Sequence, residues 1–342
     1  MKVILVAGAT GQQGGSVIRA LSDSEDYICL ALTRNPETPK AQKLHHLKNV
    51  KLISGNLNDI QQLRAIFEDA RSAPEGAIWG VFVALEYPGL GGNAESEENQ
   101  GKNIATVAQE FQVQSYIYTT SCMLPFPDDK PPIPKTTRHS KVSIEKHVAS
   151  LDMPWTILRP GFFMENFNTS VSGRFTGAAV QYCMSPDVKL QLLVGIFDTV
   201  GTYGAEPVHL QTVDDVGRFS RMIFDNPMKL NHKIIDVATP GLDAQERSQT
   251  FLQAAGYDIP RIPSLIIHTV YWLNRHVQNM VGDFVQSDEL RKLDPKGYDA
   301  NLQEASNHMK LVNFEEWARR SNQNREVNEH GVTVWGLLSK RT

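Results

Sequence analysis

Cysteine is scarce in this chain, basic residues are not in excess, and long apolar runs are missing. The cysteines, Cys29, Cys122 and Cys183, lie far apart and form no C-x-x-C pair, which predicts a reducing compartment and no structural zinc. The formal net charge of −4 argues against direct nucleic-acid binding, because neutralising phosphates requires a basic surface. No apolar run reaches the roughly 18 residues that a transmembrane helix needs, so no membrane contact is expected.

The remaining composition is that of an ordinary folded protein. Of the 342 residues, 41% are hydrophobic and 21% are charged. A chain of this length buries a large core and is close to the size at which one domain becomes two lobes. The first strand pattern begins at once, which leaves no room for a signal or transit peptide. We therefore expect a cytoplasmic protein, with a nuclear location as an additional alternative.

Apolar strand patterns alternate with helix patterns as far as Pro160. Near-continuous apolar runs are typical of parallel strands that are covered on both faces. The alternation predicts an α/β fold, namely a Rossmann-like, doubly wound parallel sheet with right-handed crossovers. Strands are expected at 2–7, 28–33, 50–54, 77–84, 115–121 and 155–159, and helices at 13–22, 38–47, 59–70, 96–112 and 139–151.

The regular alternation ends after Pro160, and a loop-rich region follows. A short extended piece and a helix are expected within 208–224, and 233–238 is expected to return to the main sheet as one more strand. Further helices are expected at 243–255 and 264–281. The second of these is strongly apolar, which fits a buried packing helix, a pocket wall or an oligomer interface.

These patterns divide the chain into two parts. Residues 1–160 are expected to form a Rossmann domain that binds NADP(H), completed by the returning strand near 233–238. Residues 161–342 are expected to form a smaller, loop-rich lobe that contacts a substrate or a partner. The aromatic residues between Phe162 and Tyr203 are candidates to line an apolar pocket.

The most informative motif is a glycine-rich turn between the first strand and the first helix. Gly8, Gly11 and Gly14 follow the apolar run directly. Glycines let the backbone turn sharply and approach phosphates closely, and a helix N-terminus presents unpaired N–H groups and a partial positive charge. The spacing G-x-x-G-x-x-G differs from the standard G-x-G-x-x-G, but its place between strand and helix predicts a dinucleotide site.

Arg34 stands at the end of the second strand, where NAD-selective sites usually carry Asp or Glu. A guanidinium pairs with a 2′-phosphate through charge-assisted hydrogen bonds, so Arg34 favours NADP(H). The alternative is a solvated basic loop. Asn56 and Leu57 suit the edge and the face of an adenine ring, and Ala84 leaves room for the nicotinamide ribose.

A nicotinamide enzyme needs a group that polarises or protonates its substrate. Short-chain dehydrogenases use a Tyr-x-x-x-Lys pair on a helix, and no tyrosine here is followed by lysine at that spacing. Lys141 lies on a helix pattern, but Thr137 stands where the tyrosine would be. We interpret Lys141 as the ribose-binding and catalytic lysine, with Ser121 as a second catalytic candidate or a simple turn residue. Other candidates to replace the tyrosine are Tyr118, Thr120, Cys122 and His139. No metal-ligand pattern is found.

The order of several motifs resembles that of the NmrA-like family of atypical short-chain dehydrogenases. The resemblance covers roughly residues 1–320 and depends on VAGATGQQGGSV, ALTRNP, GNLND, SK-x-x-x-E-K-H-V, LRPGFFMENF and V-D-D-V-G. It implies a Rossmann fold and NADP(H) as the cofactor. By position, it implies that the pyrophosphate contacts Gly8, Thr10, Gly11, Gln12, Gln13 and Gly14. It also implies that Arg34 binds the 2′-phosphate and that Asn56 and Leu57 contact the adenine. Lys141 would bind the nicotinamide ribose, and Pro160 and Phe163 would flank the nicotinamide.

Two functions are open at this point. The first is an NADPH-dependent oxidoreductase that acts on an apolar small molecule, and the resemblance to fungal members implies a place in secondary metabolism. The alternative is a non-catalytic NADPH/NADP⁺ redox sensor that regulates a protein partner, because Thr137 resembles the non-catalytic side of the family. We favour the enzyme, acting as a monomer or a homodimer.

Overall fold

The structure is a computed structural model of the chain, and it describes residues 1–86, 94–121, 137–167, 208–257, 259, 272 and 295–323. The chain divides into two compact units. The first contains the described residues up to Pro160 together with Val213–Val237, and the second contains the others. The first unit therefore takes in a helix as well as the returning strand from the later part of the chain.

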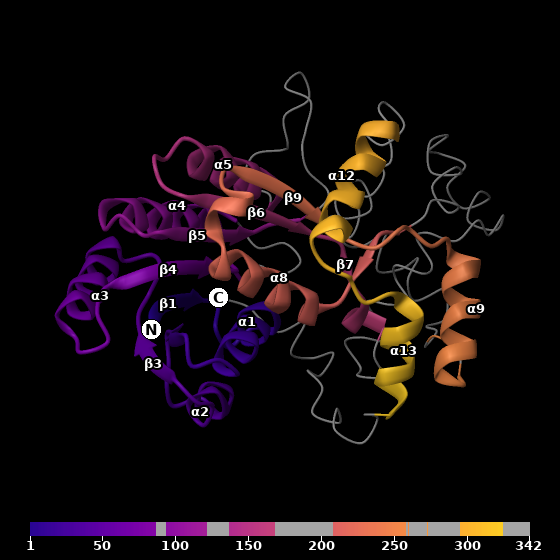
Figure 1. The fold of residues 1–342 in the computed structure, drawn as a ribbon, viewed down its shortest axis with the longest axis horizontal. Coiled ribbons are helices and arrows are strands. Elements are labelled where there is room, and N and C mark those ends of the chain that lie inside the picture. The colour runs from indigo at the N-terminus through magenta and orange to yellow at the C-terminus, as the bar shows by residue number, and fades with distance from the viewer. Residues whose placement is uncertain are drawn as a thin grey trace. The chain divides into compact units, whose positions relative to one another are not determined.

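The first unit is built on a seven-stranded sheet in the order β3-β2-β1-β4-β5-β6-β9 (Figure 1). All neighbouring strands in it run parallel. The strand order reverses between β1 and β4, which is the point where ligands bind in open α/β sheets. The strands are β1 Lys2–Ala7, β2 Tyr27–Thr33, β3 Val50–Ser54, β4 Ile78–Val83, β5 Ser115–Thr119, β6 Trp155–Pro160 and β9 Lys233–Val237.

This architecture confirms the expected Rossmann-like, doubly wound sheet. Every strand expected for it is present, and the returning strand pairs with β6. β5 ends at Thr119 rather than at residue 121. Ser121 therefore lies beyond the strand, at the carboxyl edge of the sheet.

Helices cover the sheet in two groups (Figure 1). One group packs α3 against α4 and α4 against α5, and the other packs α1 against α8. Asp59 caps α3, since its carboxylate accepts from the N–H groups of Gln61 and Gln62. The helices are α1 Gln12–Ser22, α2 Pro39–His45, α3 Ile60–Ser72, α4 Glu95–Glu110, α5 Thr137–Ala149 and α8 Val213–Asp225.

Alternate side chains of each strand point to opposite faces of the sheet, so they pack against one or the other group of helices. Val3, Leu5 and Ala7 of β1 belong to the core under α3, α4 and α5. On the other face, Gly80 of β4 lies against Ile4 and against Phe224 of α8. The inner strands β1 and β4 are thus buried on both sides, which explains why their sequences are near-continuous apolar runs.

The second unit contains a small two-stranded sheet and several helices. Its core is aromatic: Phe314 stacks on Trp317 with ring centroids 5.7 Å apart, and Phe251 and Phe167 pack on Phe314. Sequence patterns identify β8 and α9 but not the other elements. The described elements are β7 Phe162–Phe163, the 3-10 helix η1 Met164–Phe167, β8 Leu210–Gln211, α9 Ala244–Ala255, α12 Pro295–His308 and α13 Phe314–Gln323.

Some expectations fall outside the part of the chain that the structure describes. They include the expected helix 264–281, apart from Trp272, and most of the aromatic-rich stretch between Phe162 and Tyr203. Across the described helices, none has the length and apolar character to cross a membrane.

Candidate functional site

The glycine turn after β1 is packed so tightly that side chains do not fit. Gly8 has a φ of 77°, and a Cβ atom there would lie 2.1 Å from the carbonyl oxygen of Ala84. A Cβ at Gly14 would lie 2.3 Å from the carbonyl oxygen of Gly8. The Gly11 N–H donates to that same oxygen at 3.0 Å and closes the turn. The turn therefore draws the start of α1 against the ends of β1 and β4.

The N-terminus of α1 suits an anion. Its N-cap is Gly11, which has no side chain to satisfy the first N–H groups, and its first turn contains no acidic residue. Unpaired N–H groups and the helix dipole favour a negative charge at this place. Gln12 is exposed and Thr10 half-buried beside it. The residues present thus fit the pyrophosphate of a dinucleotide.

Helix α8 packs closely against α1. A Cβ at Gly217 would lie 2.4 Å from the hydroxyl oxygen of Ser16, so the two helices cross at a distance that only glycine allows. Arg221 donates to the carbonyl oxygen of Ala20 at 2.9 Å. Asp215, fully buried, forms an ion pair with Arg218 at 2.8 Å. The V-D-D-V-G motif is therefore a packing motif that fixes the glycine-turn helix.

Gln13 links α1 to β5. The Thr119 hydroxyl donates to Gln13 Oε1 at 2.7 Å. The side-chain carbonyl of Gln13 is therefore already engaged, and the amide NH₂ and the backbone N–H remain as donors. The sequence gives no signal for this contact, because the two residues are 106 positions apart.

Arg34 lies just beyond β2 and forms an ion pair across the sheet edge. Its Nη2 atom lies 2.7 Å from Oε2 of Glu86, which follows β4. The two side chains are 74% and 53% exposed, so both remain accessible to a ligand. Sequence reasoning identified Arg34 but not its acidic neighbour.

The turn after β3 is built around Asn56. The Asn56 N–H donates to Gln62 Oε1 at 2.7 Å, and its side-chain oxygen accepts from the Asn58 N–H at 3.0 Å. Leu57 is half-buried and packs on the core under α3, α4 and α5. Asn56 is exposed, and its assignment to an adenine edge stays a prediction.

Lys141 on α5 faces a buried carboxylate. Its Nζ atom lies 2.9 Å from Oε1 of Glu97 on α4, and the side chains are 18% and 1% exposed. The other oxygen of Glu97 and the hydroxyl of Tyr118 are buried without a hydrogen-bond partner. Burial raises the pKa of Tyr118 well above its usual value of 10, and the charges of Glu97 and Glu145 add to the effect. The Tyr118 phenol is thus held protonated.

A second buried ion pair lies where β5 and β6 end. Arg159 donates to both oxygens of Glu145, at 3.1 and 2.6 Å, and the Thr120 hydroxyl donates to the same carboxylate at 2.6 Å. Thr120 precedes Ser121, so this pair fixes the backbone that carries the serine. Glu145 lies on α5 and belongs to the SK-x-x-x-E-K motif, but its partner Arg159 lies on β6 and the sequence does not reveal the contact.

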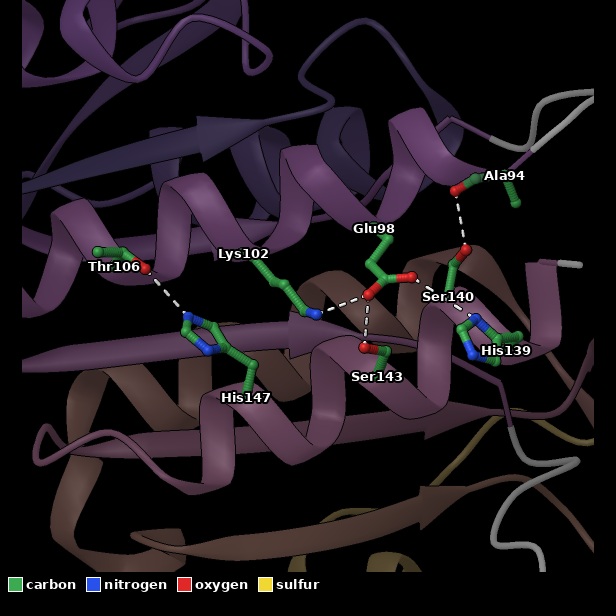
Figure 2. Close-up of polar contacts among 8 residues, drawn as sticks. All are labelled: Ala94, Glu98, Lys102, Thr106, His139, Ser140, Ser143 and His147. Carbon is green, nitrogen blue, oxygen red and sulfur yellow. Dashed lines mark hydrogen bonds and ion pairs between the residues drawn. The ribbon is translucent and has the colours of Figure 1, made fainter. Parts of the chain in front are cut away.

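His139 belongs to a polar seam between α4 and α5 (Figure 2). Its Nδ1 atom lies 3.5 Å from Oε2 of Glu98, and Glu98 also accepts from Lys102 at 2.6 Å and from Ser143 at 2.7 Å. Lys141 faces Glu97 instead. His139 and Lys141 therefore have different acidic neighbours, and His139 belongs to the contact between α4 and α5.

The two residues expected beside the nicotinamide belong to different units. Pro160 is buried at the end of β6, level with Val237 of β9. Phe163 is half-buried in β7. Their roles at the nicotinamide stay predictions.

Cysteine and metal chemistry receive no support from the described residues. Burial raises the pKa of Cys29 to about 12, which keeps its thiol unreactive. Cys122 and Cys183 lie outside the described ranges. Where the structure describes the chain, no three His, Cys, Asp or Glu residues are grouped as metal ligands would be.

The parallel sheet, the switch point and the glycine turn together define a Rossmann-type α/β protein. The model of the NmrA-like family matches residues 1–318, and the chain belongs to this family. A curated relative is the NmrA-like family domain-containing oxidoreductase himF of Aspergillus japonicus. It is 25% identical over 274 residues, which cover 75% of this chain and 74% of the relative.

Solved structures share the fold over nearly the whole chain. The crystal structure of NmrA, a negative transcriptional regulator, in complex with NADP is 21% identical, covers 96% of this chain and 98% of its own, and has a TM-score of 0.63. The Citrobacter sp. triphenylmethane reductase complexed with NADP(H) is 17% identical, with coverages of 93% and 99% and a TM-score of 0.63. At these sequence identities, the similarity shows that the chain shares the fold of these structures.

Proposed function

We propose that this chain is an NADP(H)-dependent oxidoreductase that acts on an apolar small molecule. The observation that carries the proposal is a guanidinium, Arg34, at the carboxyl end of β2 in the same unit as an uncapped glycine-turn helix. An anion site with a separate cation at the next strand suits a dinucleotide that bears an additional phosphate. The himF relative is named an oxidoreductase, and two solved neighbours are named with NADP or NADP(H).

Different residues of the chain bind different parts of the coenzyme. The N–H groups at the start of α1 receive the pyrophosphate, and Arg34 receives the 2′-phosphate with charge-assisted hydrogen bonds. The bound nicotinamide supplies the hydride. The apolar nature of the substrate is inferred from the aromatic residues that begin with Phe162.

Lys141 is proposed to hold the nicotinamide ribose. An ammonium has three N–H donors, and Glu97 engages one of them at 2.9 Å, which leaves two for ribose hydroxyls. Thr137 begins α5 in the place of the usual tyrosine. We therefore assign proton donation to Ser121, whose backbone is fixed by the Thr120–Glu145–Arg159 cluster.

The first test is a calorimetric titration of the purified protein with NADPH and NADH at one fixed salt concentration. We expect NADPH to bind at least about tenfold more tightly, a preference that Arg34→Gln abolishes, since a charge-assisted contact is worth about 1.5–3 kcal/mol. Equal dissociation constants for the two coenzymes would overturn the NADP(H) assignment.

The second test is NADPH oxidation, followed by absorbance, with a panel of apolar enones, quinones and aldehydes. We expect turnover that Lys141→Met abolishes, whereas Lys146→Met, at an exposed position of the same helix, leaves it unchanged. The alternative function, a redox sensor, is favoured only by Thr137. It requires no turnover together with different affinities for NADPH and NADP⁺.

A further inference from the structure

The ion pair between Arg34 and Glu86 crosses the place where the glycine turn begins. Arg34 follows β2 and Glu86 follows β4, and in the sheet β1 lies between these two strands. The pair therefore joins the strands that flank β1 at the carboxyl edge, where β1 continues into Gly8. This is the edge at which a dinucleotide binds in this type of sheet.

The backbone limits where the Glu86 carboxylate can lie. The Ala84 N–H donates to the carbonyl oxygen of Ala7 at 3.2 Å, and the Ala84 carbonyl lies so close to Gly8 that a Cβ there would be 2.1 Å away. Glu86 is two residues further along. Its carboxylate is therefore presented from a strand end that is fixed against the glycine turn.

The pair contributes little to folding, because its side chains are 74% and 53% exposed and exposed ion pairs are weak. Its effect on a ligand is different. A ribose 2′-phosphate carries a charge of about −1.5 to −2 at neutral pH, and it needs the guanidinium that Glu86 already engages at 2.7 Å. An unphosphorylated ribose has no such conflict with a carboxylate.

We propose that Glu86 is a specificity-determining residue that competes with the 2′-phosphate for Arg34 and so narrows the preference for the phosphorylated coenzyme. This inference rests on the proposed function, because it requires Arg34 to receive that phosphate. Coenzyme selectivity is then set by two opposite charges, one after β2 and one after β4, and not by Arg34 alone.

The experiment measures dissociation constants of NADPH, NADH, 2′,5′-ADP and ADP for the wild type, Glu86→Gln, Arg34→Gln and the double variant. In Glu86→Gln we expect NADPH and 2′,5′-ADP to bind about fivefold more tightly, because the 2′-phosphate then no longer has to displace Glu86 from its exposed ion pair with Arg34. NADH and ADP should change by less than about twofold. In the Arg34→Gln background, Glu86→Gln should change NADPH binding by less than about twofold, because the ion pair through which Glu86 acts is already absent.

Glu110→Gln is the matched control, since Glu110 forms a similar pair with Arg64 at 2.6 Å on α3 and α4, and it should leave all four constants unchanged. Equal shifts for NADPH and NADH in Glu86→Gln, or no shift for NADPH, would overturn the role of Glu86. If Arg34→Gln still weakens NADPH selectively in that case, the proposed function stands. If Arg34→Gln has no selective effect, the NADP(H) assignment and the Glu86 inference fail together.

Discussion

Lys141 Nζ lies 2.9 Å from Oε1 of Glu97, a carboxylate of which 1% is exposed. Burying a charged group costs several kcal/mol unless a partner compensates it. The second oxygen of Glu97 has no hydrogen-bond partner. Lys141, the lysine expected at the nicotinamide ribose, therefore also compensates the buried charge of Glu97 inside the first unit.

The first prediction concerns the stability of Lys141→Met. Removing the ammonium leaves Glu97 buried and unpaired, so we expect the free energy of unfolding to fall by about 2 kcal/mol. Urea unfolding followed by circular dichroism measures it. Adding Glu97→Gln should recover more than half of the loss. Additive effects of the two substitutions would show that the pair is not coupled.

The second prediction compares two neighbouring glycines of α1. A Cβ at Gly14 would lie 2.3 Å from a backbone oxygen, whereas at Gly15 the nearest atom would be the flexible end of Arg19 at 3.4 Å. Gly14→Ala should lower the free energy of unfolding by about 1–3 kcal/mol and weaken dinucleotide binding at least about tenfold. Gly15→Ala should be neutral or stabilising by up to about 1 kcal/mol. Equal behaviour of the two variants in thermal unfolding and titration would contradict the tight turn.

The third prediction compares a buried and an exposed Arg–Glu pair with the same two-bond geometry. The side chains of Glu145 and Arg159 are 8% and 9% exposed, and those of Glu110 and Arg64 are both 36% exposed. Glu145→Gln should cost about 3 kcal/mol of unfolding free energy, because it removes the negative charge from a buried, two-bond ion pair. Glu110→Gln should cost at most about 1 kcal/mol. Similar losses in chemical unfolding would show that burial does not decide the contribution.

The fourth prediction concerns pH and the seam shown in Figure 2. Burial works to raise the pKa of Glu98, but hydrogen bonds from Lys102 and Ser143 outweigh it, and the pKa is lowered from 4.5. The carboxylate therefore stabilises the fold above pH 4.5, and this contribution is lost as the pH falls through the lowered pKa.

Glu98→Gln should accordingly reduce the free energy of unfolding by about 1 kcal/mol at pH 7, and the gap should close in acid. Urea unfolding at a series of pH values measures the gap, with Glu110→Gln as the exposed comparison. A gap that widens as the pH falls would mean that the pKa of Glu98 is raised.

The sequence predicts the main sheet well, because its inner strands are nearly continuous buried runs, and burial on two faces leaves a direct pattern. The runs at 2–7 and 50–54 coincide with β1 and β3. β7 is different, since it has only two residues and depends on pairing with β8, a distant segment of the chain. α13 was missed although Asn313 caps it through the Glu316 N–H and Phe314, Trp317 and Ala318 share one face.

For the site, the sequence identifies groups but not their partners. The glycine turn is local, and its three glycines are explained by atoms within the turn or directly beside it. Glu86, Glu97 and Arg159 were missed as neighbours of Arg34, Lys141 and Glu145, because each contact joins different strands or helices. Such pairings depend on how elements pack, which composition and spacing do not encode.

The close crossing of Ser16 and Gly217 has a consequence for synthesis on the ribosome. Helix α1 emerges early, but the segment that covers it, Val213–Val237, is translated only after the first part of the second unit. A nascent chain ending near Pro160 exposes the Ser16 face of α1 and lacks the edge strand β9. We therefore expect expression fragments that stop there to aggregate, whereas fragments extended through Val237 carry every strand of the sheet.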